Sequence, residues 1–272
     1  MNAPAAAEQL AMSKAADAPQ KPARWQRSTV LQVHHWTPEV RSLRITRPDG
    51  FRFTPGHYVR LGLEDATGEA VWRPFSMVSG RDEAELEFLT LVVPEGPFSE
   101  RLRTVVNGST MLVENFGLGF LTLDQLAAGR DLWLLASGTG IGPFISILRT
   151  PALCERFEQI ILVHSVRQAS ELTYRDEITH LGGSPTFAGR LHYIPVVTRE
   201  TMLDTLKARI PALLEQSVLQ AHAGVDLDRL HSRVMVCGNP DLTRDMRGYL
   251  SARGFQSSRR GVAGQMAFEK YW

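Results

Sequence analysis

A chain of 272 residues is long enough for two ordinary domains. Its composition, 43% hydrophobic and 22% charged with a net charge of +1, is that of a soluble globular protein and argues against nucleic-acid binding. No apolar stretch approaches the roughly 20 residues that span a bilayer, so we expect no membrane association. The cysteines, Cys154 and Cys237, form no CxxC pair, which excludes a four-cysteine zinc or iron–sulfur site. We therefore expect no metal site and a cytoplasmic protein.

The first 24 residues form an alanine- and proline-rich segment. This segment has no hydrophobic core for a secretory signal, and Glu8 and Asp17 argue against an organelle transit peptide. We predict a disordered N-terminal tail over residues 1–24.

Residues 25–127 show the short period-two pattern of β-strands, separated by turn sequences such as RPDG and EDATGEA. Six short strands at this spacing predict a small antiparallel barrel or sandwich. The predicted strands cover residues 30–36, 40–47, 58–63, 71–78, 86–93 and 110–114.

Two tetrapeptides in this half are candidate anion sites. RPFS occupies residues 73–76 on a predicted strand, so Arg73 and Phe75 share one face and Ser76 lies on the other. GPFS occupies residues 96–99 and precedes a predicted short helix, whose free N–H groups could hold a pyrophosphate. A simple turn, with its serine as the helix N-cap, is the alternative for GPFS.

Residues 128–272 alternate strands and helices, which predicts a parallel sheet covered on both faces. We place the domain boundary between residues 124 and 130. The predicted strands cover residues 132–136, 160–164, 191–197, 234–237 and 265–268, and the predicted helices cover residues 143–148, 171–180, 211–219 and 240–252.

The first strand of this half runs directly into a glycine-rich turn, LWLLASGTGIGP over residues 132–143. Glycines at 138, 140 and 142 leave the backbone N–H groups open to a phosphate, and Pro143 suits the first turn of a helix. The spacing is not the GxGxxG of the common dinucleotide fingerprint, so a tight turn without a ligand is the alternative. We refer to residues 138–142 as the glycine loop.

The next strand ends near Arg167, where an NAD-binding unit would carry an acidic residue for the ribose 2′-hydroxyl. An arginine instead suits a 2′-phosphate, which its guanidinium can hold with two charge-assisted hydrogen bonds. Arg199 and Arg209 follow at or near later strand ends and could converge on the same phosphate. The alternative is that all three are solvated surface arginines. The placement of three arginines near strand ends of one α/β unit favours binding of NADP(H).

These pieces, in this order, resemble the bacterial ferredoxin/flavodoxin–NADP+ reductases, most closely the enterobacterial-type branch, from Arg24 to Trp272. The resemblance implies two domains, an antiparallel β-barrel that binds FAD and an α/β parallel-sheet domain that binds NADP. The matching stretches are RPFS, VPEGPFSERL, ASGTGIGPFISIL, HSVR, VVTRE, RIPALLE, VMVCGNPDL and FEKYW.

The resemblance also implies roles for individual residues. The expected FAD-binding residues are Arg73, Pro74, Phe75, Ser76, Gly96, Phe98, Ser99, Thr139, Tyr271 and Trp272. The expected NADP-binding residues are Gly138, Thr139, Gly140, Arg167, Arg199, Arg209 and Gly238. Ser76, Cys237 and Glu269 are the expected catalytic residues, although Cys237 on its own would more often be a buried apolar residue. Phe75 departs from the family, which usually has a tyrosine there.

The implied activity is hydride transfer from NADPH to N5 of a non-covalent FAD, followed by single-electron transfer to ferredoxin or flavodoxin. A flavin reductase, the reductase component of an oxygenase, and a redox-inactive nucleotide-binding regulator are the alternatives. We expect a monomer with a basic docking face for acidic carriers. The candidates for that face, each of which could instead be an ordinary solvated side chain, are Arg41, Arg44, Arg47, Arg259 and Arg260.

Overall fold

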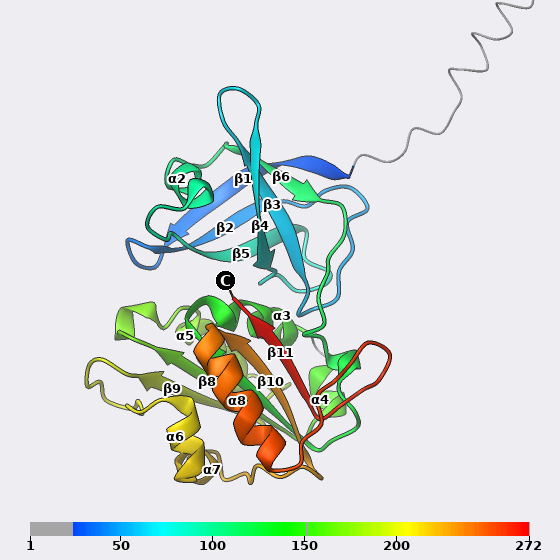
Figure 1. The fold of residues 1–272 in the computed structure, drawn as a ribbon, viewed down its shortest axis with the longest axis vertical. Coiled ribbons are helices and arrows are strands. Elements are labelled where there is room, and N and C mark those ends of the chain that lie inside the picture. Colours follow the sequence, from blue (N-terminus) through cyan, green and yellow to red (C-terminus); the bar gives the residue numbers. More distant parts are fainter. Residues whose placement is uncertain (1–23, 151, 272) are drawn as a thin grey trace, which may run out of the picture.

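The computed structural model describes residues 24–150 and 152–271. Two β-sheets lie one above the other, and the last strand ends between them (Figure 1). The predicted N-terminal tail, apart from Arg24, lies outside the described residues, and so does Trp272.

The first sheet is antiparallel, with strand order β4-β3-β6-β1-β2-β5. The sheet curls so that its two edge strands approach each other, and a bridge between Met77, directly after β4, and Phe88 of β5 joins them; we call this curled sheet the half-barrel. Alternate side chains fill its interior, among them Leu43, Leu61 and Phe88. Its elements are β1 (Trp25–His35), β2 (Val40–Thr46), β3 (Tyr58–Glu64), β4 (Ala70–Ser76), β5 (Glu85–Leu91), α2 (Pro97–Arg103), β6 (Thr110–Glu114) and the 3₁₀ turn η1 (Leu123–Gln125).

The second sheet is parallel, with strand order β11-β10-β7-β8-β9, and helices cover both of its faces. The two-domain fold class predicted from the sequence is confirmed. The strands are β7 (Asp131–Ser137), β8 (Gln159–Val166), β9 (Leu191–Val197), β10 (Ser232–Gly238) and β11 (Met266–Lys270). The helices are α3 (Gly142–Leu148), α4 (Leu153–Arg156), α5 (Arg175–Gly183), α6 (Ile210–Glu215), α7 (Val218–Ala223) and α8 (Pro240–Ala252), with 3₁₀ turns η2 (Gly138–Ile141) and η3 (Ala169–Glu171).

Every predicted strand is present, but two predicted helices are each replaced by two shorter elements. The helix expected over residues 171–180 is split into η3 and α5, because Tyr174 adopts a left-handed backbone with φ 59°. The helix expected over 211–219 is likewise α6 and α7, separated by Ser217 at φ 57°. Among the described helices, the longest, α8, has 13 residues, and none is long and apolar enough to cross a membrane.

Arg149, directly after α3, connects the two sheets. Its Nε and Nη2 donate to both carboxylate oxygens of Glu177 in α5 at 2.7 and 2.9 Å, and its Nη1 donates to Glu87 of β5 at 2.9 Å. Burial lowers the pKa of Arg149, but the hydrogen bonds and charges of Glu177, Glu87 and Glu83 outweigh it and raise the pKa. The Tyr174 hydroxyl completes the network by donating to Glu87 at 2.8 Å. This network holds the half-barrel against the parallel sheet.

Candidate active site

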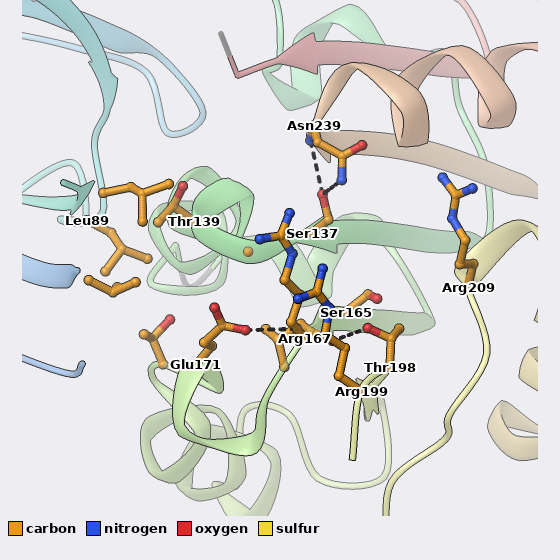
Figure 2. A pocket seen from close by; sticks show the side chains of 15 residues that line it. Leu89, Ser137, Thr139, Ser165, Arg167, Glu171, Thr198, Arg199, Arg209 and Asn239 are labelled. Carbon is orange, nitrogen blue, oxygen red and sulfur yellow. Dashed lines mark hydrogen bonds between the residues drawn. The ribbon is translucent and has the colours of Figure 1, made fainter. Parts of the chain in front are cut away.

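A pocket of about 520 Å³ opens at the carboxyl ends of β7, β8 and β9. One end is apolar and includes Leu89 and Leu91 of the half-barrel. The other end carries the exposed guanidinium groups of Arg167, Arg199 and Arg209 (Figure 2). We call this the arginine pocket; it brings together three residues that the sequence could place only near separate strand ends.

Backbone contacts hold two of these arginines together. The Arg199 N–H donates to the Arg167 carbonyl at 2.9 Å, and the Arg167 N–H donates to the Glu171 carboxylate at 2.8 Å. The same carboxylate oxygen, Glu171 Oε2, also accepts the Gln168 N–H at 2.9 Å. Arg209 lies further along the wall in Figure 2 and is 3.4 Å from Asp245. Glu171 was not identified from the sequence.

The glycine loop forms η2 and the start of α3, and it lies against the end of β10. A Cβ on Gly140 would collide with the Cys237 carbonyl oxygen, and one on Gly238 would collide with the Ser137 hydroxyl. These two glycines therefore allow the glycine loop and the end of β7 to pack closely against the end of β10. Gly138, at φ 54°, lies at the pocket wall beside Thr139, with open space where a Cβ would be.

Ser137 and Asn239, also missed from the sequence, join the same two strand ends. The Ser137 Oγ accepts two hydrogen bonds from Asn239, one from the backbone N–H at 3.0 Å and one from the side-chain Nδ2 at 3.1 Å. The Asn239 Oδ1 accepts the Leu242 N–H at 2.9 Å, which caps α8. The Asn–Pro pair at residues 239–240 is a helix-start signal that could have identified this residue.

The three expected catalytic residues meet where the half-barrel touches the end of β11. Ser76, at the end of β4, donates its hydroxyl to Glu269 Oε1 at 2.8 Å. Cys237 of β10 is fully buried and stands opposite Glu269 in the strand register. Together with Tyr271, which follows β11, these residues form what we call the junction cluster.

Burial controls protonation in the junction cluster. It raises the pKa of Glu269 from 4.5 to about 7, while the Ser76 hydrogen bond acts in the opposite direction. Burial, with the nearby Glu269 charge, raises the pKa of the Cys237 thiol well above its usual value. Burial also raises the pKa of Tyr271, whose N–H donates to the Gly238 carbonyl at 2.9 Å. The cluster therefore holds a neutral thiol and phenol beside a carboxyl that titrates near neutrality.

The expected flavin-binding tetrapeptides lie next to each other. The rings of Phe75 in β4 and Phe98 in α2 pack with centroids 5.2 Å apart; Phe75 is half-exposed and Phe98 is buried. Arg73 and Pro74 are exposed, and the Arg73 guanidinium donates to the Trp72 carbonyl at 2.8 Å.

The alternative reading of Ser99 as a helix N-cap is wrong. Gly96 is the N-cap of α2, and Ser99 is the third helical residue. Its Oγ accepts the Val93 N–H at 3.1 Å, because the chain turns back on itself before the helix begins.

Two of the five arginines expected at a docking face are structural instead. Arg41 is buried and donates to the Leu102 carbonyl at 3.2 Å, and Arg47 donates to the carbonyls of Phe51, Arg81 and Glu83. Arg44 is exposed and lies 3.6 Å from Glu85. Arg259 and Arg260 are exposed. Sequence alone does not show which guanidinium groups are used by backbone carbonyls.

Comparisons with known proteins agree with this division of the chain. Residues 29–115 match the model of an oxidoreductase FAD-binding domain, and residues 134–248 match that of an oxidoreductase NAD-binding domain. A ferredoxin–NADP reductase from Neisseria gonorrhoeae, solved with FAD and NADP bound, superposes with a TM-score of 0.85 at 32% identity, over 92% of this chain and 100% of that one.

Several sequence relatives span nearly the whole chain. Ferredoxin–NADP reductase A of Sorangium cellulosum is 38% identical over 89% of this chain and 88% of its own length. The flavodoxin/ferredoxin–NADP reductase of Escherichia coli is 37% identical, with 91% and 99% covered. The ferredoxin–NADP reductase of Pseudomonas aeruginosa is 36% identical, with 89% and 95% covered. With its two matched domains and this identity over most of its length, the chain belongs to the ferredoxin/flavodoxin–NADP reductase family.

Proposed function

We propose that this protein is a flavoenzyme that uses NADPH to reduce a ferredoxin or flavodoxin, or runs that reaction in reverse. The observation that carries the proposal is the position of the glycine loop. It borders the arginine pocket through Gly138 and Thr139 and packs through Gly140 on Cys237 of the junction cluster. A nucleotide held by the arginines can thus extend along the loop toward the reactive groups.

The arginine pocket fits the 2′-phosphate of NADP(H). Arg167, Arg199 and Arg209 carry three positive charges at one end of the pocket, against one carboxylate among the lining residues that the structure describes, Glu171. Their guanidinium groups would bind the 2′-phosphate. Thr139 and the glycine loop would hold the pyrophosphate, where the absence of side chains allows a close approach.

The surface beside the junction cluster fits a non-covalent FAD. The exposed Arg73 has no carboxylate partner among the described residues and would bind a phosphate of the cofactor, together with the first turn of α2 at Gly96 and Ser99. The half-exposed Phe75, supported by the buried Phe98, would stack on the flavin ring. FAD held there would supply the chemistry that links hydride transfer from NADPH to single-electron transfer.

The junction cluster supplies a dry environment with one titrating group. Tyr271 and Cys237 stay neutral. Burial keeps a proton on the Glu269 carboxyl up to about pH 7, whereas the hydrogen bond that Ser76 donates to Oε1 favours the ionised carboxylate. The pair can therefore exchange a proton with the flavin edge that Ser76 would approach. By its family resemblance, Tyr271 would occupy the place where a nicotinamide ring stacks, and it would have to move or share that place.

A basic, partly apolar surface next to the junction cluster is the proposed face for the carrier. Arg247, Arg259 and Arg260 line one hollow of this surface, and no acidic residue among the described residues lines it with them. Phe120 is 59% exposed and lines one hollow with Arg259 and Arg260 and another with Glu269. Acidic carriers would be attracted to the positive charge. We also propose that the protein is cytoplasmic and monomeric and binds no nucleic acid.

The first test is reduction of the purified protein by NADPH and by NADH, followed in parallel by stopped-flow absorbance. We expect a yellow protein whose flavin bleaches far faster with NADPH. A colourless protein, or equal rates with the two nucleotides, would contradict the proposal.

The docking face is tested by the double charge reversal Arg259→Glu/Arg260→Glu. We expect kcat/KM for ferredoxin or flavodoxin to fall about tenfold or more at low salt, with ferricyanide reduction unchanged, since a small acceptor needs no docking. Arg81→Glu, which reverses an exposed charge in the turn between β4 and β5, is the control. An equal loss in the control variant would place the face elsewhere.

A further inference from the structure

His164 of β8 is a fully buried histidine that none of the steps above uses. Its Nε2 lies 3.0 Å from the carbonyl oxygen of Gly138 in the glycine loop. A carbonyl oxygen can only accept, so Nε2 must carry the hydrogen and Nδ1 must be the bare nitrogen. Among the described residues, Nδ1 has no hydrogen-bond partner.

The surroundings of His164 do not favour a polar ring. In the strand register it stands between Ala136 of β7 and Pro195 of β9, on a face of the sheet that packs in an apolar cluster. Burial lowers the pKa of His164 to about 4, so the ring is neutral throughout the physiological range. A leucine would fill this place without leaving a nitrogen unpaired. The hydrogen bond to Gly138 is thus the specific contribution of the histidine.

That hydrogen bond fixes the orientation of one peptide in the loop. The peptide between Gly138 and Thr139 is planar, and in a trans peptide the carbonyl and the following N–H point in opposite directions. The Gly138 carbonyl points toward His164 in the sheet. The Thr139 N–H therefore points the opposite way, toward the side on which Gly138 and Thr139 line the arginine pocket. Gly138 reaches this arrangement with φ 54°, a conformation that glycine adopts readily.

We propose that His164 is a positioning residue for coenzyme binding: it holds the Gly138–Thr139 peptide so that the Thr139 N–H is presented to the pyrophosphate of NADP(H). The proposal rests on the proposed function of the arginine pocket. It predicts different effects on two parts of the coenzyme. The 2′-phosphate is bound by arginines that do not touch His164, whereas binding of the pyrophosphate depends on the oriented loop.

The test compares His164→Leu with His164→Gln in the FAD-loaded protein, using flavin difference spectra or calorimetry. NADP+ and adenosine 2′-monophosphate, which keeps the 2′-phosphate but lacks the pyrophosphate, are the two ligands. For His164→Leu we expect the Kd of NADP+ to rise about tenfold, the effect of losing one oriented hydrogen bond. The Kd of adenosine 2′-monophosphate should stay within about twofold. His164→Gln, whose amide can reach the Nε2 position, should recover most of the NADP+ affinity.

A third variant keeps the test decisive if His164→Leu does not fold. His164→Asn places its amide near the Nδ1 position, so it should bind NADP+ as weakly as a variant without the hydrogen bond while His164→Gln binds well. Equal NADP+ affinity in the Asn and Gln variants, or equal weakening of both ligands, would refute the role of His164. If the unaltered protein binds no NADP+, it is the proposed function that fails, whatever the variants do.

Discussion

The arginine pocket and the junction cluster both adjoin the glycine loop, but they consist of different kinds of residues. The pocket presents exposed, permanently charged arginines from one sheet edge. The cluster gathers Ser76, Cys237 and Glu269, which are buried or half-buried, and burial sets the protonation of Cys237 and Glu269. The first suits recognition of a charged ligand in water, and the second suits proton and electron transfer away from water.

The two sites also depend differently on the domain arrangement. The charged end of the arginine pocket comes from the parallel sheet and its connections alone, because the carboxyl ends of parallel strands meet at one edge. The junction cluster exists only when β4 of the half-barrel is pressed against β11 of the other sheet. A disturbance of the domain contact should therefore damage the cluster and spare 2′-phosphate recognition.

The largest expected effect follows from breaking the Arg149 network with Arg149→Met. This leaves the carboxylates of Glu87 and Glu177 without their cation at the domain contact, which we expect to lower the free energy of unfolding by about 3 kcal/mol. Urea unfolding measures this, and FAD retention should fall with it, while binding of adenosine 2′-monophosphate to folded protein is kept. Arg244→Met, which removes the ion pairs of an exposed arginine with Asp241 and Asp245, should cost less than about 1 kcal/mol. Equal losses in the two variants would show that the network does not hold the domains together.

Recognition of the 2′-phosphate by the arginine pocket is tested by Arg199→Ala. Loss of one charge-assisted bond to the 2′-phosphate should raise KM for NADPH roughly 30-fold and leave KM for NADH unchanged. Arg209→Ala should have a smaller effect, since Arg209 is ion-paired with Asp245 and lies further along the pocket wall. Steady-state kinetics with both nucleotides measure the two changes. A parallel rise of KM for NADH would assign Arg199 to general nucleotide binding instead.

The same difference explains what could be predicted from the sequence. Period-two and alternating patterns located the strands, and Arg167 and Arg199 could be grouped because strand ends of a parallel sheet converge. Arg209 lies at the N-cap of α6 instead, twelve residues after β9 ends. No local pattern links Ser76 to Glu269, 193 positions away, and only the family resemblance suggested that they meet. The structural roles of Arg41 and His164 rest on hydrogen bonds to distant carbonyls, which leave no trace in a local pattern.

The titration of the junction cluster is tested by measuring how stability depends on pH in the variant Glu269→Gln. In the folded protein the carboxyl keeps its proton up to about pH 7, whereas the unfolded chain releases it near 4.5. The folded state therefore holds the extra proton between these values, and the free energy of unfolding falls as pH rises through them. For the half-buried carboxyl we expect the Gln variant to gain about 1–2 kcal/mol over the unaltered protein at pH 8 and almost nothing at about pH 4, below the unfolded pKa, measured by urea unfolding without FAD. A gain that is the same at both pH values would mean that Glu269 does not titrate in this range.

The smallest expected effect concerns Phe75, where the family usually has a tyrosine. Its ring is half-exposed beside Phe98, so a hydroxyl added at its outer end can reach a bound cofactor without entering the core. One added hydrogen bond contributes about 0.5–1.5 kcal/mol, so Phe75→Tyr should lower the Kd for FAD several-fold. Fluorescence of FAD released on dilution measures this constant. Phe98→Tyr is the matched control, because that ring is buried, and its hydroxyl would gain no cofactor contact and would destabilise the barrel. Equal Kd values for the unaltered protein and Phe75→Tyr would contradict the placing of Phe75 against the flavin.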